Sequence, residues 1–82
     1  MPVICRFYGI IIKMYFNDYL PPHLHAIYGE YNGIIDLNTF EMLEGDLPTR
    51  ALKLVQEWTE YYQLDLLKMW ETKEFFKLPE LK

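Results

Sequence analysis

Hydrophobic and polar positions alternate along the first half of the chain, which is typical of half-buried β-strands. In residues 10–16, every second side chain is apolar and falls on one face of the predicted strand: Ile10, Ile12, Met14 and Phe16. The apolar segment before it ends at Tyr8-Gly9, a pair that predicts a tight hairpin turn or a bulge. After a Pro-Pro break the strand pattern resumes, turns at Gly29-Glu30 and again at Asn38-Thr39, and ends near residue 43. We expect an antiparallel meander of four or five strands over residues 3 to about 43.

In the second half, apolar residues recur at spacings of three and four, which predicts helices. The clearest stripe consists of Ala51, Leu54, Val55, Trp58, Tyr61 and Tyr62. Asp46 or Thr49 is the expected cap of this helix. A second helical stretch runs from Asp65 to about Phe76, and a break near residues 62–64 gives either a helical hairpin or one bent helix. The predicted fold class is therefore α+β, one domain spanning residues 1–82, with two C-terminal helices (about 48–76) packed on one face of the sheet.

The amino-acid composition predicts an interaction surface. Hydrophobic residues make up 51% of the 82 residues and aromatic residues 17%, more than the centre of so small a domain can hold. Part of this aromatic surface is expected to contact a protein partner or a second copy of the chain.

Charge and cysteine usage exclude several classes. The net charge is −4 and no basic stripe is present, which disfavours direct binding to DNA or RNA. The single Cys5 provides neither an intramolecular disulfide nor a thiolate metal cluster, and this fits a reducing, cytoplasmic setting. We expect the first residues to form neither a signal peptide nor a membrane span.

The segment LPPHLHAIYGEY contains the only two histidines, His23 and His25, which share one face of the predicted strand. A metal site needs three or four ligands, and Asp18, Glu30 and Asp36 are the nearby acids. Asp36 is the strongest of these if the strand register places it beside the histidines. Because no third and fourth ligand is defined, we expect no metal and no cofactor.

A metal-free catalytic site is the competing interpretation. One histidine would act as a general base oriented by Asp18 or Asp36, and Arg6 would stabilise a developing anion, as in a small nuclease-like enzyme. The chain contains no serine, and no histidine lies near Cys5 in the sequence. The structural interpretation therefore leads, with the histidines hydrogen-bonded in a strand beside the Pro-Pro turn.

The tyrosines indicate function better than the histidines do. The chain has seven tyrosines, and tyrosine gives rigid contact area suited to interfaces. The residues expected to bind a partner are Tyr15, Tyr19, Tyr28 and Tyr31.

The segments RFYGIIIKMYFND, PPHLHAIYGEY, IID and EGDLPTRALKLVQEW, followed by a second tryptophan, resemble the domain-of-unknown-function family 4160 over residues 1 to about 71. The positions that match the family pattern are Arg6, Gly9, Asp18, Pro21, Pro22, His23, His25, Tyr28, Gly29, Gly45, Leu47, Pro48, Arg50, Glu57 and Trp58. Tyr19 and Tyr62 stand where relatives usually carry histidine, and tyrosine is a poor zinc ligand.

The resemblance implies a small bacterial or phage-borne protein in a toxin–antitoxin-like gene context. With the residues, it favours a small acidic protein-interaction module that acts as a toxin–antitoxin-like or phage–host regulatory inhibitor through a tyrosine-rich surface. The alternative is the small His-dependent enzyme or toxin centred on the Pro-Pro-His-x-His element.

Overall fold

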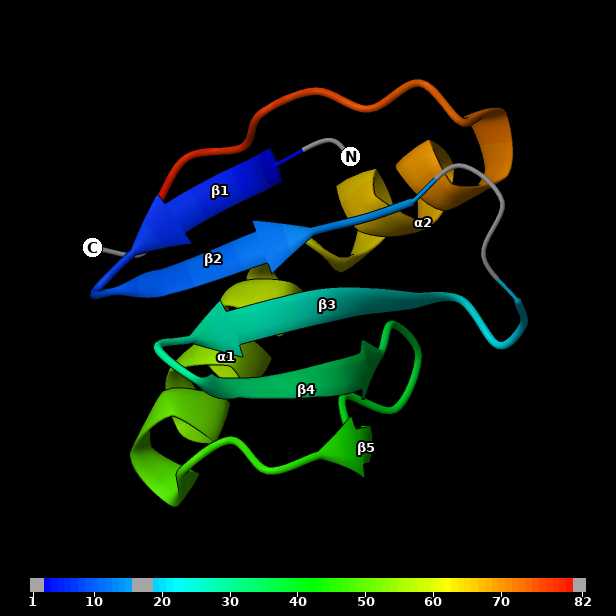
Figure 1. The fold of residues 1–82 in the computed structure, drawn as a ribbon. Coiled ribbons are helices and arrows are strands. Elements are labelled where there is room, and N and C mark those ends of the chain that lie inside the picture. Colours follow the sequence, from blue (N-terminus) through cyan, green and yellow to red (C-terminus); the bar gives the residue numbers. More distant parts are fainter. Residues whose placement is uncertain (1–2, 16–18, 81–82) are drawn as a thin grey trace.

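The computed structural model describes residues 3–15 and 19–80, and within them the chain forms five strands followed by two helices (Figure 1). The strands are β1 (Val3–Phe7), β2 (Ile10–Lys13), β3 (His23–Tyr28), β4 (Tyr31–Asp36) and β5 (Met42–Gly45). The helices are α1 (Thr49–Tyr61) and α2 (Gln63–Thr72). The predicted α+β class is confirmed, and the meander has five strands.

The sheet is an antiparallel meander whose strands pair in the order β1-β2-β3-β4-β5. The predicted turn between β1 and β2 is a two-residue hairpin with positive φ at both Tyr8 (49°) and Gly9 (79°). Such primed turns match the twist of the strands they join, and glycine is favoured in them because it has no Cβ. The turn between β3 and β4 likewise has Gly29 at φ 61°. Because the strands alternate in direction, the β1–β2 and β3–β4 hairpin turns lie at the same end of the sheet (Figure 1).

The two faces of the sheet differ in what covers them. Both helices lie on one face, behind the sheet as seen in Figure 1. The buried side chains of that face alternate as predicted, for example Ile10 and Ile12 on β2 and Met14 just after it, whereas the predicted Phe16 lies outside the described residues. We call the opposite side the open face, and strand pairing defines two rows of side chains on it. One row is Arg6, Ile11, Ile27 and Asn32, and the other is Lys13, His25, Ile34 and Glu44.

The helices differ from the sequence prediction at their ends. The N-cap of α1 is Pro48 and makes no side-chain capping bond, so the predicted Asp46 or Thr49 cap is wrong. The Asp46 carboxylate instead accepts a hydrogen bond from the Asn32 backbone at 3.1 Å, which ties the start of the helical region to β4. Helix α2 ends at Thr72, short of the expected residue 76, because Lys73 adopts the left-handed conformation at φ 62°.

The two helices form one bent segment rather than a hairpin. Tyr62 is the only residue between them, and its backbone N–H still donates to Trp58 O at 3.1 Å. The chain therefore changes direction at Tyr62 without reversing, and α1 and α2 cover different parts of the same sheet face (Figure 1). No helix in residues 3–15 and 19–80 is long and apolar enough to cross a membrane.

Trp58 occupies the centre of the core, as predicted from its position in the apolar stripe. It is fully buried, and its ring stacks on Phe7 with centroids 5.8 Å apart. Its indole N–H donates to Pro79 O at 2.8 Å. The C-terminal segment 73–80 is thereby held alongside β1, where the Leu78 N–H donates to Ile4 O at 2.9 Å (Figure 1).

Candidate functional site

The histidine pair lies at the end of β3 away from the hairpin turns. His23 is fully buried, and its Nδ1 lies 2.7 Å from the carbonyl oxygen of Pro21. Its ring is also in aromatic contact with Tyr19 and Trp70, at centroid distances of 5.0 and 5.1 Å. The Pro21 carbonyl oxygen thus accepts a hydrogen bond from His23 Nδ1, and aromatic rings pack around that histidine.

His25 shares this aromatic environment but is only half-buried, on the open face. Its ring lies 5.2 Å from that of His23 and meets Tyr15 edge-on at 4.6 Å. Two imidazoles surrounded by Tyr15, Tyr19 and Trp70 form a packed aromatic cluster. Its members contribute contact area and hydrogen bonds to the end of the sheet.

Asp36, the expected third metal ligand, lies beside the histidines, but its carboxylate already accepts other hydrogen bonds. Asp36 pairs with His23 across β3 and β4, as the metal hypothesis required. However, its Oδ1 accepts hydrogen bonds from the backbone N–H groups of Asn38 and Thr39, at 2.7 and 3.1 Å. Asp18 lies outside the described residues. In the part of the chain that the structure describes, no three His, Cys, Asp or Glu side chains are grouped to hold a metal ion.

The other members of the proposed catalytic set are not brought together. Arg6 pairs with Ile11, which in turn pairs with Ile27, so the guanidinium belongs to the row nearer the hairpin turns. Two strand spacings, about 10 Å, separate β1 from β3.

Cys5 is buried, and burial raises the pKa of its thiol, which makes it a poor nucleophile at neutral pH.

The two histidines are expected to differ sharply in their effect on stability. His23→Ala should lower the free energy of unfolding by about 2–3 kcal/mol, because it empties a buried, hydrogen-bonded position. His25→Ala should cost about 1 kcal/mol or less, since its ring is partly in solvent. Urea unfolding followed by tryptophan fluorescence measures both values, and equal losses would contradict this assignment.

The four tyrosines expected to bind a partner do not form one surface. Tyr15 and Tyr19 lie beside the histidines, where the Tyr19 hydroxyl donates to Glu44 Oε2 at 3.2 Å. Tyr28 and Tyr31 pair with each other at the opposite end of β3 and β4, next to the hairpin turn. A single tyrosine-rich face is therefore absent among these four residues, and the sheet separates them into two groups.

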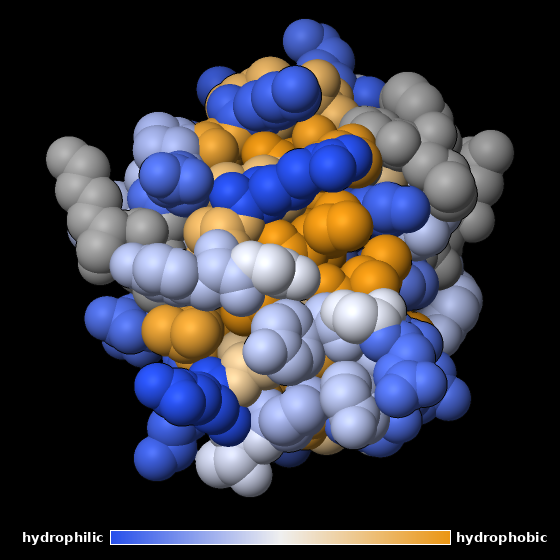
Figure 2. Space-filling view, turned by 60° about the vertical axis from the view of Figure 1, so that its left-hand side comes forward, coloured by the Kyte–Doolittle hydropathy of each residue, from blue (hydrophilic) through white to orange (hydrophobic). Residues whose placement is uncertain are grey.

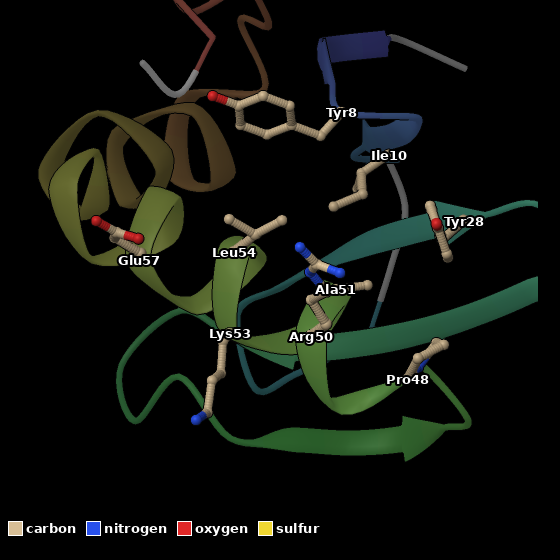
Figure 3. A pocket seen from close by; sticks show the side chains of 9 residues that line it. All are labelled: Tyr8, Ile10, Tyr28, Pro48, Arg50, Ala51, Lys53, Leu54 and Glu57. Carbon is tan, nitrogen blue, oxygen red and sulfur yellow. The ribbon is translucent and has the colours of Figure 1, made fainter.

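A groove lies at the hairpin end, between the hairpin turns and α1 (Figure 3). Its volume is about 680 Å³, within the range of small-ligand and side-chain pockets. The residues that line it are Tyr8, Ile10, Tyr28, Pro48, Arg50, Ala51, Lys53, Leu54 and Glu57. We call this feature the hairpin groove. Figure 2, which brings the hairpin-turn side forward, shows hydrophobic residues in a band with long hydrophilic side chains lying across it.

The two tyrosines of the hairpin groove are held by neighbouring groups. The Tyr28 ring packs on the Gly9 turn, where a Cβ would lie only 3.3 Å from Tyr28 Cε1. Tyr8 is 60% exposed, and its ring meets Phe7 edge-on with centroids 6.1 Å apart. Figure 3 shows the Tyr8 side chain reaching from the first hairpin turn toward α1. Both rings therefore border the groove from defined positions.

Helix α1 supplies the other wall and the charge. In Figure 3, Leu54 and Arg50 point toward the space that Tyr8 borders, whereas Lys53 extends away from it. Arg50 is exposed, and its guanidinium can bind a carboxylate through two parallel hydrogen bonds. Tyr28 was expected at an interface from the sequence, whereas Tyr8, Arg50 and Leu54 were not. They come from separate segments, and only the meander brings them together.

The structure is a small α+β domain, with a five-stranded antiparallel meander, two helices on one face and a groove at the hairpin end. The chain belongs to the family described as Domain of unknown function (DUF4160), which it matches over residues 9–71. The resemblance seen in the sequence is thus confirmed. No curated protein and no solved structure shows a significant match to the chain.

Proposed function

We propose that this chain is a protein-interaction module that binds a segment of its partner in the hairpin groove. The observation that carries the proposal is the meeting of Tyr8, Tyr28 and Arg50 around one groove of about 680 Å³. Tyrosine and arginine are among the residue types that dominate binding energy at protein interfaces. Exposed tyrosines fixed by their neighbours also lose little conformational entropy when a partner binds.

The lining of the groove indicates the chemistry of the bound segment. Leu54 and the rings of Tyr8 and Tyr28 give an accessible apolar surface that suits an apolar side chain, with Ile10 and Ala51 buried beneath it. Arg50 at the groove suits a neighbouring carboxylate, which it can hold in a bidentate pair. The proposed ligand is therefore a partner segment in which a large apolar residue stands next to Asp or Glu.

The proposed setting is the bacterial or phage-infected cytoplasm, with the product of a neighbouring gene as partner in a toxin–antitoxin-like regulatory pair. This setting is the one that the resemblance to the family implies. The enzyme alternative has less support, because Asp36 serves the turn that follows β4 and Arg6 lies away from the histidines.

A capture experiment tests the proposal. The tagged chain, expressed in the organism that encodes it, should retain its partner, and Arg50→Glu should lower the captured amount about tenfold or more by repelling the partner's carboxylate. Lys68→Glu is the matched control, since it makes the same charge change on an exposed side chain of α2 that does not line the groove. Equal capture by wild type and Arg50→Glu would refute the proposal.

A further inference from the structure

The open face has the composition of an interface core with a charged rim. Its centre is aliphatic, with Ile11 and Ile27 paired across β2 and β3 and Ile34 paired with His25 on the next strand. All three isoleucines are half-buried, so each still presents apolar area to solvent. An apolar centre surrounded by polar groups is the usual anatomy of a protein interface.

The rim is charged with opposite signs on its two sides. Arg6 and Lys13 lie on β1 and β2, at one side of the sheet. Glu44 lies on β5, at the other side, and Tyr19 donates a hydrogen bond to its carboxylate. On the strands, the open face thus carries Arg6 and Lys13 on one side, apolar side chains in the middle and Glu44 on the other side, and Glu80 of the C-terminal segment lines the same pocket as Arg6.

This order of charges is self-complementary under a two-fold rotation. When two such sheets face each other across an axis parallel to the strands, β1 of one molecule lies opposite β5 of its partner. Ile27, on the central strand, then lies opposite Ile27 of the second copy. The basic edge of each copy meets the acidic edge of the other, as an isologous dimer interface requires. We infer that the open face binds a second copy of this chain in this orientation.

The size of the face sets the strength of the dimer. Five strands span about 20 Å across, and strands of this length run for about 13–20 Å. Such an area is smaller than the roughly 800 Å² per partner of a standard interface, so the dimer should dissociate in the micromolar range. The hairpin groove lies at the hairpin end, on the helix side of the sheet, and stays available when two open faces meet.

Sedimentation equilibrium or light scattering over about 1 µM to about 1 mM tests the dimer directly. Wild type should pass from monomer to dimer with rising concentration, and Ile27→Lys should weaken association by about 100-fold or more, since it places two buried ammonium groups opposite each other. Leu64→Lys is the control, because Leu64 is 82% exposed on α2 and lies outside the open face. A wild-type chain that stays monomeric up to 1 mM would overturn the inference.

Charge reversal supplies a second test that does not depend on the folding of Ile27→Lys. The double variant R6E/K13E has two acidic edges, and E44K has two basic edges, so each alone should associate at least about tenfold more weakly than wild type. Mixing the two in equal amounts should restore association as a heterodimer. Failure of the mixture to associate, with both variants folded by circular dichroism, would overturn the proposed orientation.

Discussion

Replacing Trp58 with alanine is expected to lower the free energy of unfolding by about 3–5 kcal/mol. The indole is fully buried, stacks on Phe7 and lies 5.2 Å from the Tyr62 ring. Its N–H also fixes the C-terminal segment through Pro79 O. A domain of this size has a total stability of about 4–12 kcal/mol, so the loss should show as a large shift of the urea midpoint.

A graded series separates packing from hydrogen bonding at this position. Trp58→Phe keeps most of the ring contact but leaves Pro79 O without its donor, and should cost about 2 kcal/mol. Tyr61→Ala, at a 78%-exposed neighbour on α1, should cost less than about 0.5 kcal/mol beyond any change in helix propensity. If Trp58→Ala were no worse than Tyr61→Ala, Trp58 could not be the centre of the core.

Gly45→Ala is expected to have the other large effect, a loss of about 3–5 kcal/mol. Gly45 has φ 117°, a backbone conformation that residues with a Cβ rarely adopt. A Cβ there would also collide with the Asn32 carbonyl oxygen and lie 2.5 Å from Gly33 Cα, both backbone atoms of the paired strand. The β4–β5 pairing would have to open to make room. Circular dichroism during thermal unfolding measures the loss.

Gly29→Ala is the matched control for this prediction. Gly29 also has a positive φ, 61°, but nothing lies within 4 Å of the position a Cβ would take. The substitution therefore adds only the left-handed conformational cost of about 1–2 kcal/mol. Equal losses for the two variants would mean that the close approach of β5 to β4 does not limit the choice of residue at position 45.

The alternation of apolar residues predicted the antiparallel meander, although β5 (Met42–Gly45) extends past the expected end near residue 43. Ile10, Ile12 and Met14 fall on the buried face as expected, and Tyr8-Gly9 turns where the pattern breaks. Helix ends were harder to predict, because capping depends on where a side chain finds its partner. Asp46 has the residue type of an N-cap, yet its carboxylate binds the Asn32 backbone from the adjacent strand.

The site could be predicted only in part, for a related reason. His23 and Asp36 do pair across β3 and β4, but the sequence could not show that the Asp36 carboxylate is used by the turn that follows it. The hairpin groove depends on the direction in which α1 crosses the sheet. No spacing within the chain relates Tyr8 to Arg50, and their proximity is a property of the tertiary structure alone.

The C-terminal segment along β1 limits how these molecules can aggregate. An exposed sheet edge can accept a strand from another molecule, and a sheet with two free edges can grow without end. Here the Leu78 backbone already bonds to Ile4, so β5 is the one outer strand whose edge the described chain leaves available. Pairing through the β5 edge alone would join only two molecules, and we expect removal of residues 73–80 to expose the β1 edge as a second site for strand pairing.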